Sequence, residues 1–167
     1  MTAQATYHLA ELNVGRLVAD PSDPRVAEFM ANLDRINGLG KRMPGFVWMM
    51  EGSGEPGTGN TEAAIDGDVR QIANLTVWED VASLETFVFG TLHKQFYERR
   101  AEWFELMADQ HFVMWWVPAG HKPTLEEALE KLALKTEQGD SEEAFGWAFL
   151  EDAKLHRALG CAPVAAE

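Results

Sequence analysis

The order in which strand and helix patterns follow one another is the feature that most limits the fold of this chain. Four stretches have the two-residue alternation of apolar side chains that is typical of a half-buried β-strand. They are residues 7–14, 43–50, 70–78 and 110–118, and the second of them begins with a turn. Helical spacing lies between the first two and between the last two, which gives the order βαββαβ. This order predicts an α+β domain with a ferredoxin-like antiparallel sheet.

The helical stretches have ordinary start and stop signals. Residues 20–39 begin with the turn sequence DPSDPR and continue with apolar residues at helical spacing. A second helix is expected after Asp80, a residue type that often caps helices at the N-terminus. A third helix is expected over residues 124–139, because Thr124 and Glu127 have the spacing of a capping box.

We expect one domain over residues 1–150, followed by a C-terminal tail over residues 151–167. Within the domain, residues 51–69 are rich in glycine and acidic residues and predict a long loop. The capped helix and a short edge strand at residues 143–151 are additions to the βαββαβ core. Such a sheet has helices on one face, and we expect the other face, with Trp78, to be covered by a second subunit. The prediction is therefore a dimeric α/β barrel.

Composition narrows the classes of partner. The net charge of −13 at pH 7 argues against nucleic acid and against anionic membrane surfaces. No apolar run approaches the roughly 18 residues needed to span a bilayer, and the N-terminus lacks the features of a signal peptide, so we expect a cytoplasmic protein. The single cysteine, Cys161, excludes an intramolecular disulfide. The five histidines are scattered without ligand spacing, so no metal site is expected.

Residues 91–107, TLHKQFYERRAEWFELM, have the pattern of one amphipathic helix with two polar residues on its apolar side. A guanidinium in an apolar stripe costs several kcal/mol unless a partner meets its charge. One interpretation is structural: Arg100 reaches the sheet edge or a carboxylate such as Glu11 or Glu79, and His93 bonds a backbone carbonyl. The other is functional: both residues line a pocket and meet polar groups of a ligand.

Five segments, spread over residues 7–149, carry a family resemblance. They are HLAELNVGRL, PGFVW, NLTVWEDVASLETFVF, HKQFYERRAEWFE and WWVPAGHKPTLEEALEKL. Together they resemble the DUF3291 family of small bacterial proteins. That family in turn resembles, largely in topology, the dimeric α/β-barrel superfamily, which includes antibiotic-biosynthesis monooxygenases and haem-degrading monooxygenases.

The superfamily resemblance implies a homodimer with an aromatic-lined pocket between sheet and helices in each protomer. It implies a small cofactor-independent monooxygenase-like enzyme, or a related cyclase or isomerase, that acts on an aromatic or polyketide-type substrate. On this resemblance His93 is the candidate catalytic base, because a neutral imidazole can take a phenolic proton. The candidate substrate-binding residues are Asn13, Trp48, Asn74, Trp78, Tyr97, Arg100 and Trp103.

The haem-degrading members imply an alternative, a non-catalytic dimer that binds a small apolar ligand such as haem. Those members have an iron-ligating histidine on a helix and a tryptophan one or two turns before it. Here Phe87 lies near the tryptophan position, and either His93 or Tyr97 falls at the ligand position. We therefore expect no cofactor, with haem as the alternative. A third hypothesis is a structural dimer whose aromatic side chains are simply core.

Overall fold

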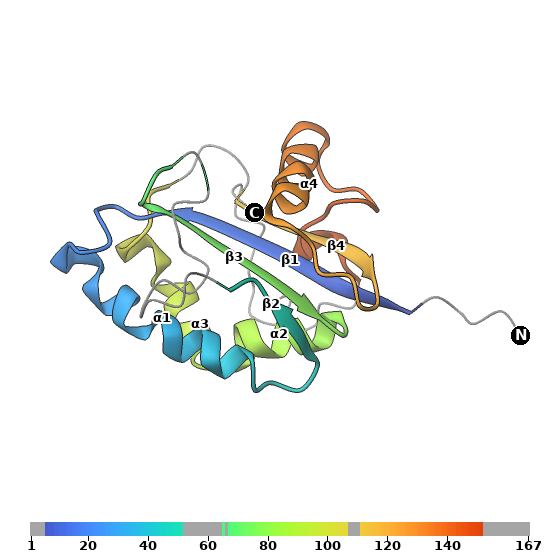
Figure 1. Cartoon of the computed structure of the whole chain (residues 1–167), viewed down its shortest axis with the longest axis horizontal. Helices are drawn as coiled ribbons and strands as arrows, with labels where there is room; N and C mark the ends of the chain where they lie inside the picture. Colours follow the sequence, from blue (N-terminus) through green and yellow to red (C-terminus); the bar gives the residue numbers. More distant parts are fainter. Residues whose placement is uncertain (1–5, 52–64, 66, 107–110, 152–167) are drawn as a thin grey trace, which may run out of the picture.

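The computed structural model of the protein describes residues 6–51, 65, 67–106 and 111–151. Its centre is a four-stranded antiparallel sheet with the strand order β2-β3-β1-β4 (Figure 1). The strands are β1 (Tyr7–Arg16), β2 (Phe46–Met49), β3 (Gln71–Trp78) and β4 (Phe112–Pro118). The predicted α+β class and the antiparallel sheet are confirmed.

In the described part of the chain, four α-helices connect or follow the strands. They are α1 (Ala27–Gly40), α2 (Val81–Gly90), α3 (His93–Glu98) and α4 (Leu125–Gln138), with short 3-10 turns at Pro24–Val26, Arg100–Glu102 and Trp147–Phe149. The predicted cap of α2 is present, since the Asp80 carboxylate accepts a hydrogen bond from the backbone N–H of Ser83. Within the described ranges, no helix is both long enough and apolar enough to cross a membrane.

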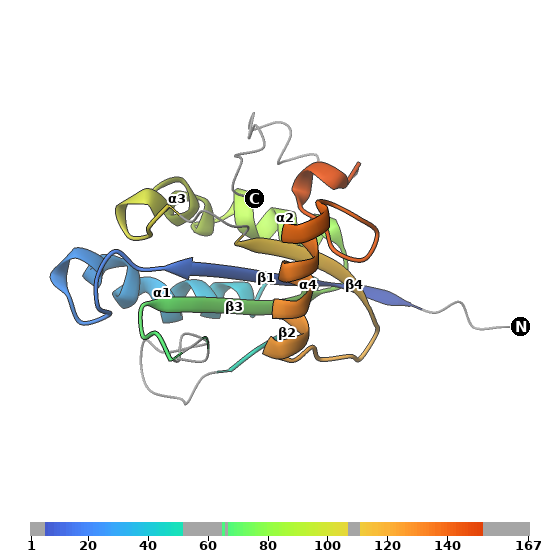
Figure 2. The ribbon, with the colours of Figure 1, turned by 90° about the horizontal axis from the view of Figure 1, so that it is seen from above.

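Helices lie on both faces of the sheet. Figure 1 shows α1, α2 and α3 below the sheet and α4 above it, and Figure 2 shows α4 crossing the strands. The expectation of helices on one face only is therefore wrong. The physical reason is the apolar stripe of α4, which packs on the sheet through Leu125, Ala128, Leu129 and Leu132. The sheet side chains beneath it, which we call the α4 face, are Ala10, Leu12, Val14, Ala73, Leu75, Val77, Val113, Trp115 and Val117, and all are buried.

The opposite side of the sheet, toward α1–α3, mixes apolar and polar side chains. We call it the cavity face; it includes Leu9, Glu11, Asn13, Asn74, Thr76, Trp78, Phe112 and Met114. The alternation that the sequence predicts for β1 and β3 is thus observed. Trp78 lies here, fully buried against α2, and not on a face left for a second subunit. The argument for a dimer from an uncovered sheet face therefore does not hold. The dimer itself stays a prediction.

The start of α4 shows how the predicted capping box is used. The Oγ1 atom of Thr124 accepts a hydrogen bond from the backbone N–H of Glu127 at 3.1 Å, as predicted. The Glu127 carboxylate binds two other side chains: Trp115 donates to it through Nε1 at 3.2 Å, and His121 Nε2 lies 2.8 Å away. The cap therefore also ties α4 to β4.

Residues 91–107 do not form the single helix that their pattern predicts. The helix α3 ends at Glu98, and the chain then runs through a 3-10 turn to an isolated β-bridge between Phe104 and Leu17. The backbone groups that a helix would use bond β1 and its extension instead, since Val18 N–H donates to the Trp103 carbonyl at 2.9 Å. These partners are far away in sequence, so local periodicity does not reveal them.

The C-terminal additions differ in part from the prediction. The helix is present as α4, but residues 143–151 form no strand. Phe145 makes one isolated bridge with Met114 of β4, and a 3-10 turn follows. Most of the predicted loop 51–69, and all but the first residue of the tail 151–167, lie outside the described residues.

Candidate functional site

A cavity of about 510 Å³ lies between the cavity face of the sheet and the helices α1, α2 and α3. Most of its wall is apolar, with aromatic and aliphatic side chains from the helices. Its polar lining comes from three places: the sheet (Glu11, Asn13, Asn74, Thr76), α1 (Asn37), and the segment from α3 onward (His93, Tyr97, Glu98, Arg100, Glu105, His111). A large apolar cavity with a few convergent polar groups is the usual form of a small-molecule site.

The register of the sheet creates the polar floor of this cavity. Antiparallel pairing of β1 with β3 sets Asn13 opposite Asn74 and Glu11 opposite Thr76. Because side chains of directly paired residues project from the same face, two polar pairs stand side by side under the helices. Both asparagines, predicted as substrate-binding residues, line the cavity.

Glu11 is a functional candidate that sequence reasoning treated only as a partner for Arg100. Its side chain is 6% exposed, and its Oε2 atom accepts a hydrogen bond from Thr76 Oγ1 at 2.8 Å. Burial raises the pKa of Glu11 to about 8, although the Thr76 bond acts in the opposite direction, so the carboxyl group is protonated at pH 7. The signal available in the sequence was an acidic residue at an inward position of an apolar strand.

His93 combines the two roles that its sequence context left open. Its Nδ1 atom lies 3.3 Å from the carbonyl oxygen of Val88, and its ring packs 4.8 Å from that of Phe87. A carbonyl oxygen only accepts hydrogen bonds, so Nδ1 bears the hydrogen and Nε2 keeps its lone pair. Burial lowers the pKa of His93 to about 4, and the imidazole is neutral at pH 7. The same ring lines the cavity.

Arg100 also lines the cavity, and its contacts bear on the two interpretations of the sequence. Its guanidinium lies 4.4 Å from the centre of the Tyr97 ring and donates to the Tyr97 carbonyl oxygen at 2.9 Å. Among the described residues, no carboxylate lies within ion-pair distance of it, so the expected pairing with Glu11 or Glu79 is wrong. A cation at a cavity wall that has no acidic partner among the described residues is suited to an anionic group of a ligand.

The three predicted tryptophans do not line the cavity. Trp48 pairs with Val77 in the sheet and therefore points to the α4 face. Trp103 is buried in a separate cluster with Leu17 and neighbouring apolar residues. Trp78 lies behind the polar floor, where its Nε1 donates to Thr76 Oγ1 at 2.9 Å. The structure thus brings together His93, Asn13, Asn74, Tyr97 and Arg100, and leaves Trp48, Trp78 and Trp103 outside the lining.

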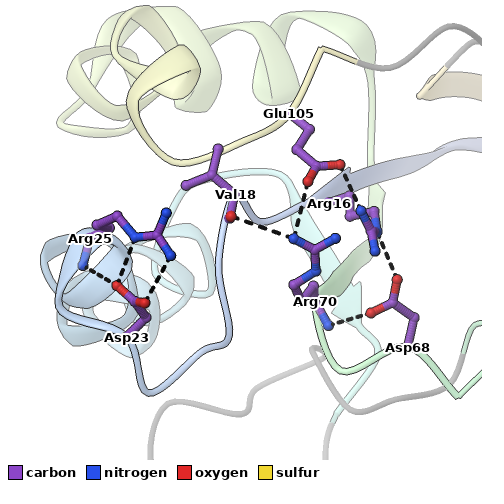
Figure 3. Close-up of polar contacts among 7 residues, drawn as sticks. All are labelled: Arg16, Val18, Asp23, Arg25, Asp68, Arg70 and Glu105. Carbon is purple, nitrogen blue, oxygen red and sulfur yellow. Dashed lines mark hydrogen bonds and ion pairs between the residues drawn. The ribbon is translucent and has the colours of Figure 1, made fainter.

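A network of ion pairs holds one end of the cavity (Figure 3). Arg16, at the end of β1, contacts Asp68 through Nε and Glu105 through Nη1, each at 2.8 Å. Arg70 approaches the same Glu105 carboxylate at 3.1 Å. The hydrogen bonds from Arg16 lower the pKa of both Asp68 and Glu105. Because Glu105 lines the cavity, this network fixes the segment that closes the wall beside Arg16.

No group of three or more His, Cys, Asp or Glu side chains is close enough to hold a metal ion in the part of the chain that the structure describes. The polar groups of the cavity include Glu11 and His93, which are both neutral at pH 7, and the guanidinium of Arg100. The remaining polar lining residues are Asn13, Asn37, Asn74, Thr76, Tyr97, Glu98, Glu105 and His111.

Comparison with known proteins gives a family but no activity. No curated protein matches the sequence. PA3566 from Pseudomonas aeruginosa is similar in structure, with a TM-score of 0.45 and 10% identity over 71% of this chain and 100% of that chain. NE2512, a protein of unknown function from Nitrosomonas europaea, has a TM-score of 0.44 and 11% identity over 72% of this chain and 97% of that chain. Neither similarity indicates a function.

The family assignment rests on a match over most of the chain. The model for the domain of unknown function DUF3291 matches residues 8–159. This range includes the described strands and helices, except for the first residue of β1, and all the polar residues that line the cavity. The chain belongs to the DUF3291 family.

Proposed function

We propose that the protein is a small enzyme that removes a proton from an aromatic or polyketide-type substrate bound in the cavity. The reaction would be that of a cofactor-independent monooxygenase, with dioxygen as second substrate, or of a related cyclase or isomerase. One observation supports this most: a neutral imidazole, with its tautomer fixed by the Val88 carbonyl, lines a largely apolar cavity of about 510 Å³.

His93 has the geometry of a general base. Its Nδ1–H bond holds the ring, and the lone pair on Nε2 can take a proton from a phenol or from a carbon beside a carbonyl group. With its low pKa the free imidazole is a weak base. The anion that forms on the substrate lies beside the new imidazolium, and this opposite charge favours the transfer. Arg100 supplies a second positive charge at the cavity wall.

The test compares two histidine variants on a panel of polycyclic phenols and their keto tautomers. His93→Gln should lose turnover, while His121→Gln should keep it, because His121 is exposed and pairs with Glu127 outside the cavity. Oxygen consumption separates a monooxygenase from an isomerase. Circular dichroism checks that both variants fold. Wild-type turnover in His93→Gln would contradict the proposal.

A second candidate function, non-catalytic binding of haem or a similar ligand, has one observation in its favour. A histidine that ligates a metal commonly donates its other ring N–H to a carbonyl oxygen, as His93 does to Val88. Titration with haemin would then give a saturable Soret shift that His93→Ala abolishes and His121→Ala keeps. Saturable binding without turnover of any substrate would favour this function over the enzyme.

The homodimer and the ferredoxin-like, barrel-type assignment belong to the same proposal. The strand order β2-β3-β1-β4 supports the topology. For the dimer, the support is an aromatic surface beside β4: Trp116 and Phe149 are each 41% exposed, and both contact the buried Phe145. Native mass spectrometry should show twice the mass of one chain, and Trp116→Gln should shift the protein to the monomer. A wild-type monomer at micromolar concentration would overturn the dimer.

A further inference from the structure

Glu11 is an ionisable side chain inside the cavity that the proposed proton removal by His93 does not use. It lies on β1, a central strand of the sheet, and is 6% exposed. Among the described residues no cation lies within ion-pair distance of its carboxyl group. A buried carboxyl group without a counter-charge is costly to ionise and stays protonated. A purely structural position here would be served better by an apolar residue.

The hydrogen bonds behind Glu11 have a fixed direction. The indole Nε1–H of Trp78 can only donate, and it donates to Thr76 Oγ1 at 2.9 Å. The Thr76 hydroxyl hydrogen is then directed to Glu11 Oε2, which accepts at 2.8 Å. With Oε2 occupied as an acceptor, the carboxyl proton is carried by Oε1. This chain of hydrogen bonds from Trp78 through Thr76 fixes the orientation of the Glu11 carboxyl group.

We propose that Glu11 donates a hydrogen bond from Oε1 to a carbonyl oxygen of the substrate, and that Thr76 and Trp78 position it for this role. The inference rests on the proposed function and narrows its substrate class to aromatic ketones that enolise. A neutral carboxylic acid in an apolar site is an effective donor to an oxygen that gains negative charge.

The step balances within the cavity. The C–H bond beside the ketone breaks, and its proton passes to Nε2 of His93. The electron pair forms the C=C bond of the enolate, and the carbonyl π electrons move to oxygen. The Glu11 O–H group stabilises this oxyanion by hydrogen bonding and keeps its proton. The reverse transfer from His93 to another carbon completes an isomerisation. In a monooxygenation the enolate carbon instead gives its electron pair to dioxygen, which forms a C–O bond, and the resulting peroxide anion takes the proton from His93.

The test uses fluorenone, an aromatic ketone without an ionisable group, and measures binding without turnover. Because only the protonated Glu11 can donate, the Kd of the wild type should rise about tenfold per pH unit above the pKa. We expect a pH-dependent Kd between pH 6.5 and 9.5 in the wild type. Glu11→Gln should bind with a Kd that is constant within about twofold, because an amide N–H donates at every pH in this range.

A control variant and the other titratable groups of the cavity show whether the pH dependence of the Kd comes from Glu11. Glu85→Gln replaces a carboxyl group that is equally buried but lies outside the cavity lining, and it should keep the wild-type profile. The other titratable groups at the cavity are His93, Tyr97, Glu98, Arg100, Glu105 and His111. A profile that persists in Glu11→Gln would come from one of these and would overturn the proposal, as would a flat wild-type profile or no saturable binding.

An infrared titration of the unliganded wild type measures the protonation of Glu11 and does not depend on the folding of any variant. The C=O stretch of a protonated carboxyl group should be present at pH 7 and vanish as the pH rises through about 8. Its absence at pH 7 would overturn the proposal. The two proposals fail separately: His93→Gln should lose turnover yet keep the pH-dependent binding of fluorenone. Turnover with pH-independent fluorenone binding would refute the role of Glu11 and leave the enzyme.

Discussion

Arg16 and Glu105 are separated by 89 residues in sequence, and their Nη1 and Oε2 atoms lie 2.8 Å apart. A backbone bond accompanies the ion pair, since the Glu105 N–H donates to the Arg16 carbonyl oxygen at 2.8 Å. The chain after the 3-10 turn is therefore attached to the end of β1 by both its backbone and its side chain. This attachment forms one end of the cavity.

Glu105→Gln removes the charge that Arg16 and Arg70 share. We expect lower stability toward urea at low salt and a smaller difference from the wild type at high salt, because these partly exposed charges are screened. The lowered pKa values of Glu105 and Asp68 mean that this stabilisation is complete above the ordinary carboxylate pKa. It is lost only as the pH falls through the lowered values.

A matched control for this variant is Glu102→Gln, which removes a carboxylate that pairs with Arg99 away from the network. Glu105→Gln loses two partly exposed ion pairs and Glu102→Gln loses one, but of the two carboxylates only Glu105 lines the cavity. The dissociation of fluorenone, followed by stopped-flow fluorescence, should become faster in Glu105→Gln and should stay unchanged in Glu102→Gln. Equal dissociation rates in the two variants would show that the network does not hold the cavity wall.

Gly15 permits the close approach of the Phe104 ring. A Cβ atom at position 15 would lie 2.6 Å from Cδ1 of that ring. Gly15→Ala should therefore destabilise the protein by about 1–3 kcal/mol in chemical denaturation, because the ring must move. Gly38→Ala in α1 is the control: nothing lies within 4 Å of its added Cβ, and it should be neutral or stabilising.

A double-mutant cycle tests whether the Phe104 ring causes the destabilisation expected for Gly15→Ala. Phe104→Leu removes the ring atoms that the new methyl group would meet, so Gly15→Ala should cost less in that background than in the wild type. Costs that simply add would mean that the alanine acts through something other than the ring.

The sheet was predictable from sequence, and the reason lies in short-range periodicity. The alternation in β1 and β3 assigns each side chain to a face, and that alone places Asn13 and Asn74 on one side and Leu12 and Leu75 on the other. A local signal, two polar residues on an apolar arc, also made His93 and Arg100 candidates for a pocket, and both line the cavity.

Other features depend on contacts that local patterns do not contain. Trp48 faces away from the cavity because a register shift occurs between Phe46 and Trp48. Trp103 is core because the chain turns back to Leu17. The role of Glu11 needs the cross-strand partner Thr76, which is 65 residues away. In each case local patterns do not show which residue, distant in sequence, lies beside the one in question.

The pH dependence of stability should report Glu11 and His93 separately. The folded protein holds the Glu11 proton up to a pKa of about 8, whereas the unfolded chain releases it near 4.5, so this contribution falls as the pH rises between those values. His93 has a pKa of about 4 when folded and 6.5 otherwise, so its contribution falls as the pH drops from 6.5 to 4. Between pH 6.5 and 8 only Glu11 acts, and the wild type should lose about 2 kcal/mol.

Urea denaturation across pH 4.5–8 in the two variants checks these signs. Glu11→Gln should be equally stable at pH 6.5 and 8 and should weaken below 6.5, because burial lowers the pKa of both His93 and His111. His93→Gln should show the wild-type loss above 6.5 and should lose less stability below 6.5 than Glu11→Gln does, because only His111 then opposes Glu11. A wild type that gains stability between pH 6.5 and 8 would mean that Glu11 is ionised in the folded protein.

Arg100→Met separates a ligand contact from a structural one. The guanidinium contacts Tyr97 by stacking and by one hydrogen bond to a backbone carbonyl, and no described carboxylate pairs with it. Methionine can replace the packing on the ring, so the free energy of unfolding should change by less than about 1 kcal/mol. Affinity for an aromatic carboxylate such as 2-naphthoate should fall about tenfold or more, while affinity for its neutral methyl ester should not. Calorimetric titration of both probes decides the matter: an equal loss for acid and ester would show that Arg100 shapes the wall without binding the charge.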